Sequence, residues 1–181
     1  PLNLHASSSL QVAAEHAKII VMAVPTKGIR EVCQSLVKHL TEPVLFVHVS
    51  KGIEPDSLKR ISEMMREEIP HEFIQEIVVL SGPSHAEEVI LKHPTTVTAA
   101  CEDIKYAEIV QDLFMHGYFR VYTNTDVIGV EMGGALKNII AIASGALTGL
   151  GLGENSRGFL ISRGMVEMIY LGKVLGGNTQ A

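Results

Sequence analysis

The residue with the clearest chemical potential in this sequence is Lys137. It lies within residues 127–152, a run of apolar and small residues whose only other charge is Glu131. A lysine is rarely buried without a partner or a function. On a helix, the stripe that contains Lys137 would otherwise consist of small residues, namely Gly134, Ala141, Ser144 and Thr148. Such a stripe leaves room for a ligand to approach the ammonium group or for another helix to pack closely.

Desolvation at such a position would lower the pKa of Lys137, which suits a proton-transfer catalyst. The structural alternative is a helix lysine whose stem packs on apolar surface and whose charge reaches water or Glu131. The two residues are about 120° apart around an ideal helix, so we do not expect a direct ion pair between them.

Polar, charged or turn-forming residues stand at the ends of three expected strands. These segments are Val24-Pro25, Ser50-Lys51-Gly52 and 81–88. In open α/β sheets, ligands bind beyond the carboxyl ends of the strands. We therefore expect Lys51 to project over the sheet edge toward a phosphate group. The alternative is a solvated lysine in a surface loop.

The third of these segments has two interpretations. Ser84 and Glu87 fit the capping pattern S-x-x-E, which explains both residues without a function. A helix N-terminus is also an anion site, and Gly82 would let a ligand come close. We do not expect His85 to be a ligand, and we interpret His48 as a hydrogen-bonded histidine of the core.

Strands and helices must position these residues. Five short apolar runs predict strands at 18–25, 44–49, 77–80, 95–100 and 119–123. Helices are predicted at 26–40, 55–70, a short stretch from Ser84, 104–115, 127–152 and 155–171. Near-continuous apolar strands that alternate with helices predict the α/β class, with a mostly parallel, Rossmann-like sheet covered on both faces. Beyond about residue 126 only helix is expected. We therefore divide the chain into an α/β domain, 1–125, and the start of an all-α domain, 126–181.

Composition excludes several classes of protein. The chain has 181 residues, a net charge of −5 and no block of Lys or Arg, which disfavours a nucleic-acid partner. Cys33 and Cys101 are far apart and show no zinc spacing, so we expect no metal and two reduced thiols in a cytoplasmic protein. Glu131 and Lys137 interrupt the long apolar segment. The remainder, 138–153, is shorter than the ~20 residues of a membrane span, so none is expected.

No G-x-G-x-x-G fingerprint is present to indicate dinucleotide binding. Glycines at 149, 151 and 153 follow a predicted helix rather than a strand. The sequence starts at Pro1 and ends at Ala181 in segments that look like interior sequence, so we expect a piece of a longer protein.

Five ordered segments together resemble the bacterial NAD(P)-dependent glycerol-3-phosphate dehydrogenases. They are 47–54, 80–88, 93–98, 119–123 and 129–138, and the similarity extends over essentially the whole chain. The resemblance implies an oxidoreductase that interconverts dihydroxyacetone phosphate and sn-glycerol 3-phosphate with NADP or NAD as cofactor. Its product supplies phospholipid synthesis. A homodimer is among the assemblies that the resemblance allows.

The resemblance also implies roles for individual residues. Lys137 would be the catalytic proton donor and acceptor, and the neighbouring Asn138 would help to orient the substrate. The implied cofactor contacts are Lys51, Ala86 and Pro25, and the implied substrate contacts are Lys51, Gly82, Ser84, Lys137 and Asn138.

Three features depart from the family pattern. The Gly-rich phosphate loop would lie before Pro1, and a phosphate-binding arginine would lie after Ala181, so we expect the 181-residue piece alone to have little activity. Residues 154–158 also differ from the usual segment. Two alternatives stay open: a related hydroxyacid dehydrogenase with another substrate, and a non-catalytic α/β scaffold or helical oligomerisation module. Preference between NAD and NADP is also open.

Overall fold

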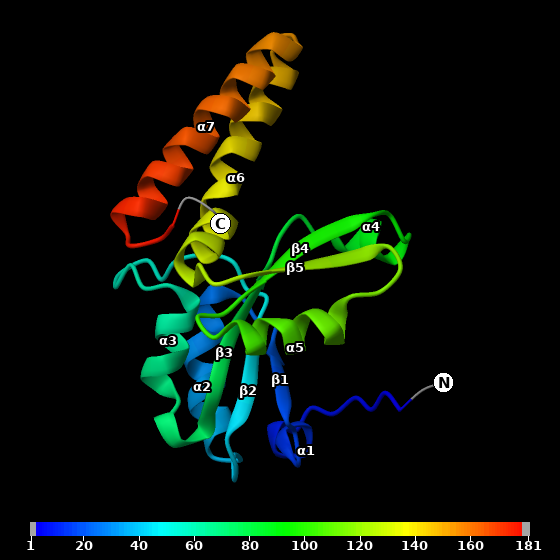
Figure 1. The fold of residues 1–181 in the computed structure, drawn as a ribbon, viewed down its shortest axis with the longest axis vertical. Coiled ribbons are helices and arrows are strands. Elements are labelled where there is room, and N and C mark those ends of the chain that lie inside the picture. The colour runs from blue at the N-terminus through cyan, green and yellow to red at the C-terminus, as the bar shows by residue number, and fades with distance from the viewer. Residues whose placement is uncertain (1–2, 179–181) are drawn as a thin grey trace.

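Five strands form one sheet in the computed structural model, which describes residues 3–178 (Figure 1). The strands are β1 Ile19–Met22, β2 Val44–His48, β3 Ile74–Ser81, β4 Thr95–Ala100 and β5 Phe119–Asn124. Their order in the sheet is their order in the sequence. β1, β2 and β3 run parallel, β4 is antiparallel to β3, and β5 is parallel to β4. The prediction of a mostly parallel sheet is therefore confirmed.

Helices cover both faces of this sheet, as Figure 1 shows. The helical segments of this part are α1 Leu10–Ala14, η1 Thr26–Gly28, α2 Ile29–Val37, α3 Ile61–Glu68, η2 His71–Phe73, α4 Ala86–Ile90 and α5 Ile104–Phe114. Successive side chains of a strand point to opposite faces. Phe46 accordingly packs into a core with α2 and α3, whereas Leu45 and Val47 pack into a second core with α5. Burial on both faces explains why β2 is continuously apolar.

Two long helices, α6 Val127–Gly149 and α7 Glu154–Val174, pack side by side and extend away from the sheet (Figure 1). The buried residues of α6 are Val130, Glu131, Met132 and Gly134, all in its first half, which packs against β3 and β4. Farther along, Ile142 and, on α7, Phe159 are exposed. The all-α region expected after residue 126 is thus present.

Helix α6 is also long and apolar enough, by length and composition, to cross a membrane. Its packing is that of a helix in a folded domain, because the carboxylate of Glu131 is buried and ion-paired with Arg60. We therefore keep the expectation that this segment does not span a bilayer.

The helix predicted from Pro55 starts later than expected, at Ile61. Residues 55–57 form turns, and Leu58 is 74% exposed with a φ of +57°. Residues 54–59 form a loop that is closed by a hydrogen bond, in which the amide of Glu54 donates to the carbonyl of Lys59 over 2.9 Å. Proline suits a first helical turn, but these loop contacts decide the conformation instead.

The capping pattern predicted at Ser84 is not formed. Helix α4 begins at Ala86 with His85 as its N-cap, so Ser84 does not cap it, and Glu87 pairs with the His85 ring at 2.8 Å. At the start of the helical segment predicted from residue 26, Thr26 lies in η1 and donates its hydroxyl to the carbonyl of Lys51 over 3.1 Å, which tethers the next loop.

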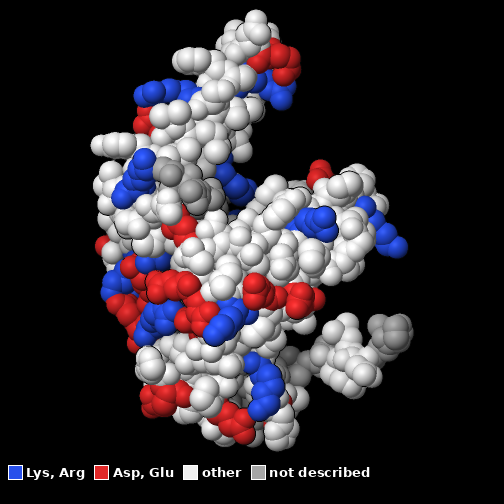
Figure 2. Space-filling view, viewed as in Figure 1, with Lys and Arg blue, Asp and Glu red and all other residues white. Residues whose placement is uncertain are grey.

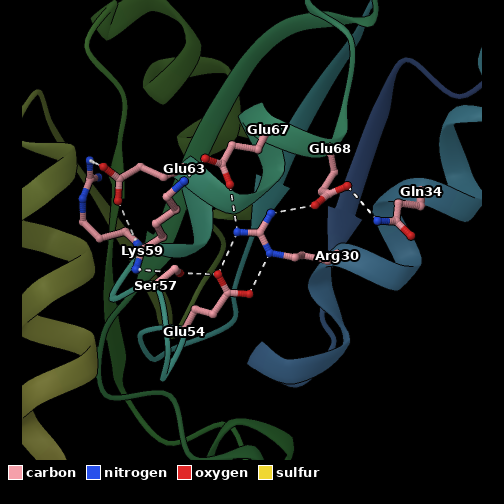
Figure 3. A network of polar contacts seen from close by, with 9 residues as sticks. Arg30, Gln34, Glu54, Ser57, Lys59, Glu63, Glu67 and Glu68 are labelled. Atoms are coloured by element: carbon pink, nitrogen blue, oxygen red, sulfur yellow. Dashed lines mark hydrogen bonds and ion pairs between the residues drawn. The ribbon is translucent and has the colours of Figure 1, made fainter.

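An ion-pair network holds the loop after β2 against two helices (Figure 3). Arg30 of α2 donates to both carboxylate oxygens of Glu54 over 2.7 Å, and it also bonds Glu67 and Glu68 of α3. The hydrogen bond from Arg30 is the main reason why the pKa of Glu54 falls to about 2, and it also lowers the pKa of Glu68. The network therefore fixes the segment that begins with Lys51.

This network should make stability depend on pH in the acid range. A carboxylate whose folded pKa is depressed contributes stability above its unfolded pKa, and this contribution is lost as the pH falls through the folded pKa. In the full-length protein, Arg30→Met should therefore flatten the loss of unfolding free energy between about pH 5 and pH 2, as measured by urea unfolding at several pH values. Lys18→Met is the matched control, because it removes a pair with Glu42 in which both side chains are mostly exposed. Equal flattening in both variants would contradict the prediction.

Both cysteines are free and buried, Cys33 in α2 and Cys101 after β4. Burial raises the pKa of Cys33 to about 12 and that of Cys101 to about 11. Because the thiolate is the reactive form, neither residue should react with a thiol reagent at neutral pH while the protein is folded. Mass-spectrometric detection of adducts should find labels at these positions only after denaturant is added, and rapid labelling of either one in the native protein would contradict this.

Candidate active site

The strand ends singled out in the sequence lie at the edge of the sheet where α6 begins to cross it. Lys51 follows β2, and Ser81 is the last residue of β3. A Cβ atom added to Gly134 of α6 would lie 2.6 Å from Ser81 Oγ and 3.5 Å from Lys51 Cγ. The absence of a side chain at Gly134 is therefore what lets α6 pack against Lys51 and Ser81.

Two positive charges meet at this place. Desolvation of the half-buried Lys51 lowers its pKa, and the positive charge of the nearby Lys137 lowers it further. Lys137 donates from Nζ to Asn138 Oδ1 over 3.2 Å. Two ammonium groups that disfavour each other's charge would be relieved by a bound anion, so the arrangement suits a phosphorylated ligand.

Lys137 does not pair with Glu131, as the helical spacing indicated. The carboxylate of Glu131 is instead bound by Arg60, Ser62 and His48. Figure 2 shows a hollow on this face of the molecule, between the α6–α7 pair and the lobe formed by β4, β5 and α4. Blue lysine or arginine atoms lie at its inner end.

Lys51 also belongs to a cavity of about 460 Å³, which it lines together with Ser84 and Ala86. The other walls are apolar and include Leu80 and Val97. A concave apolar site with a few polar groups is the usual form of a small-molecule or cofactor pocket. These residues could hold part of a nicotinamide cofactor, with Lys51 as the charged contact.

The remaining residues with implied roles lie elsewhere. Among the residues that the structure describes, Pro25, Gly82, Lys137 and Asn138 do not line that cavity. Pro25 is exposed after β1, and its carbonyl accepts a hydrogen bond from the amide of Gly28 over 2.8 Å. Lys51 is therefore the residue that links the cavity to the pair of lysines.

The fold itself requires a glycine at position 82. Its φ is +158°, and an added Cβ would lie 2.7 Å from both the carbonyl oxygen of Thr96 and the Cα of Val97. The glycine is thus required by the close approach of β4, whether or not a substrate also contacts it.

Two residues beside the lysine pair, Ser81 and Gly134, were not predicted from the sequence as site residues. Ser81 is 7% exposed and faces α6 at the position where Gly134 has no side chain. The available signal for Ser81 was its place at the end of an apolar strand, and for Gly134 it was membership of the small-residue stripe. Neither signal shows that the two residues meet, because that contact joins segments more than fifty positions apart.

Comparisons with known proteins show which family the chain belongs to. Residues 1–107 match the family model described as NAD-dependent glycerol-3-phosphate dehydrogenase N-terminus, and residues 126–181 match the corresponding C-terminus model. Proteins named glycerol-3-phosphate dehydrogenase [NAD(P)+] from Lysinibacillus sphaericus and Bacillus velezensis are 66% and 59% identical to this chain. These matches cover 98% and 95% of the chain, but 53% and 50% of the relatives.

A crystal structure of glycerol-3-phosphate dehydrogenase from Coxiella burnetii has a similar fold. It superposes with a TM-score of 0.88 at 34% identity and covers 99% of this chain and 54% of that one. The chain thus spans about half the length of the curated relatives it matches. Because the two family models together account for most of its residues, the chain belongs to the NAD-dependent glycerol-3-phosphate dehydrogenase family.

Proposed function

We propose that the protein containing this chain interconverts dihydroxyacetone phosphate and sn-glycerol 3-phosphate with NADPH or NADH, and that its product supplies phospholipid synthesis. The observation that carries this proposal is that Gly134, one helical turn before Lys137 on α6, packs against Lys51 and so brings the two lysines near each other at one edge of the sheet. A phosphate and a carbonyl that develops negative charge are the groups that two such cations would bind. The names of the relatives support the same activity.

In this proposal Lys137 transfers the proton. Its ammonium group donates to the ketone oxygen as that oxygen gains negative charge, and the neutral amine accepts the proton in the reverse direction. Asn138, which accepts a hydrogen bond from Lys137 Nζ, holds the lysine and helps to orient the substrate. Substrate contacts at Gly82 and Ser84 complete the proposed set.

Lys51 binds both ligands in the proposed site. Lys51 lies near enough to Lys137 to feel its charge, and it also lines the apolar cavity with Ala86. A nicotinamide cofactor, when bound, supplies or accepts the hydride. Pro25 is kept as a proposed cofactor contact, supported by its place at the end of β1 on the same edge of the sheet.

The wider organisation follows from the same proposal. Residues 1–125 would be the C-terminal portion of the NAD(P)-binding domain, and residues 126–181 the first helices of the substrate domain. We place the protein in the cytoplasm, because both cysteines within residues 3–178 are free thiols. A homodimer stays a prediction, which sedimentation of the full-length protein would test.

The test is a steady-state assay of the full-length protein. Dihydroxyacetone phosphate should give rapid oxidation of NADPH or NADH, whereas 2-keto acids and unphosphorylated dihydroxyacetone should give little. The 181-residue chain assayed in parallel should have little activity. Preference for a 2-keto acid would favour the hydroxyacid dehydrogenase alternative, and absence of turnover with every ketone would favour the scaffold.

A further inference from the structure

Glu131 is a buried carboxylate at the contact between α6 and the α/β part. Its side chain is 4% exposed. Oε2 accepts hydrogen bonds from Arg60 Nη1 over 2.6 Å and from Ser62 Oγ over 2.7 Å, while Oε1 accepts from the Ser62 amide over 2.8 Å. The Nε2 atom of His48, itself buried, lies 3.1 Å from Oε1. Every one of these partners belongs to the α/β part.

These contacts keep the carboxylate charged. Burial alone would raise the pKa of Glu131, but the close contact with the His48 ring and the hydrogen bonds from Ser62 outweigh this effect and lower it below its ordinary value. Hydrogen bonds to an ionised acceptor are shorter and stronger than those between neutral groups. The cluster of Glu131, His48, Arg60 and Ser62, here called the Glu131 cluster, is therefore a directional connection between the two parts of the chain.

Two members of the Glu131 cluster, His48 and Glu131, each precede one of the lysines closely in the sequence. His48 ends β2, and Lys51 follows it by three residues. Glu131 precedes Lys137 by six residues on the same helix, about 9 Å along its axis. Arg60 and Ser62 lie at the start of α3. Movement of Glu131 would therefore move Lys137 relative to Lys51.

Apolar contacts alone would define the position of α6 poorly. Val130 packs against Val79 and Ala100, but apolar burial is not directional. Where α6 contacts Ser81 it has a glycine, Gly134, and a residue without a side chain offers little resistance to rotation of the helix. Contacts from β2 and from the start of α3 to one carboxylate supply the missing restraint.

We propose that Glu131 is a positioning residue, which through His48, Arg60 and Ser62 sets the orientation of α6 and thereby the place of Lys137 opposite Lys51. This inference rests on the proposed function, in which Lys137 carries the proton. A misplacement of about 1 Å in a catalytic group can reduce turnover by about 100-fold.

The first experiment uses Glu131→Gln in the full-length enzyme, which keeps the size of the side chain and removes its charge. We expect kcat to fall by roughly 10- to 100-fold while KM for NADPH changes by less than about threefold. In a Lys137→Met background the same substitution should reduce residual turnover by less than about twofold, because its effect passes through Lys137.

A second readout does not depend on activity. The pKa of Lys51 can be measured from the pH dependence of its amine-labelling rate, followed by mass spectrometry. It should rise in Glu131→Gln, since Lys137 would no longer be held opposite it. Glu63→Gln is the matched control, because Glu63 also pairs with Arg60, over 3.1 Å, but lies on α3. That control should leave both readouts unchanged.

If Glu131→Gln does not fold, Ser62→Ala replaces it in both measurements. It removes the hydrogen bond from Ser62 Oγ to Oε2 and keeps the hydrogen bond from the backbone amide of residue 62 to Oε1. A lower melting temperature with unchanged kcat and unchanged Lys51 pKa would overturn the positioning role. Full turnover in Lys137→Met would instead overturn the proposed function, and the Lys51 pKa would still decide whether Glu131 positions α6.

Discussion

Replacement of Lys137 by methionine in the full-length enzyme should reduce kcat for dihydroxyacetone phosphate by roughly 10²- to 10⁴-fold. Methionine keeps an unbranched apolar stem of similar length but cannot donate a proton. Binding of NADPH should change little, because Lys137 is not among the described residues that line the cavity with Ala86. Steady-state kinetics, supported by direct titration of NADPH binding, measures both quantities.

Lys173→Met is the matched control, since it removes an exposed lysine from the last turn of the neighbouring helix α7. It should retain wild-type turnover. In Lys137→Met the pKa of Lys51 should rise, but desolvation, the larger cause of its shift, should keep it below 10.5. Wild-type turnover in Lys137→Met would contradict the proton-carrier role and favour a non-catalytic α/β scaffold.

Replacement of Gly82 by alanine should destabilise the full-length protein by about 2 to 3 kcal/mol. The new Cβ would lie 2.7 Å from backbone atoms of both Thr96 and Val97. These atoms belong to β4, which pairs with β3 immediately before Gly82, so relief would require movement of the sheet itself. The free energy of unfolding from urea titration, at constant m-value, measures the effect.

Gly28→Ala is the control for this prediction. Gly28 has a φ of −96°, and an added Cβ would meet nothing within 4 Å, so the unfolding free energy should change by less than about 1 kcal/mol. Equal effects of the two substitutions would show that loss of a glycine, rather than the contact with β4, determines the result. Activity is not the readout here, because Gly82 is also a proposed substrate contact.

The strands were predictable because their signal is local. The run around Phe46 is apolar at every position, as burial on both faces of a sheet requires, and its bounds differ from the predicted ones by one residue. The start of α3 was not predictable from Pro55, because the ion pair of Glu54 with Arg30 of α2 forms only after segments distant in the sequence meet.

The sequence by itself determined that the chain is α/β followed by helix, and it marked Lys137 and Lys51 as charges at unusual places. Those conclusions depend on local apolar periodicity and on turn residues, which are properties of neighbouring positions. Only the tertiary structure decided that β4 runs antiparallel to β3, that Glu131 is held by His48 and Ser62, and that the two lysines meet. The physical reason is that strand direction and buried polar partners depend on contacts between residues far apart in the chain, which no local pattern contains.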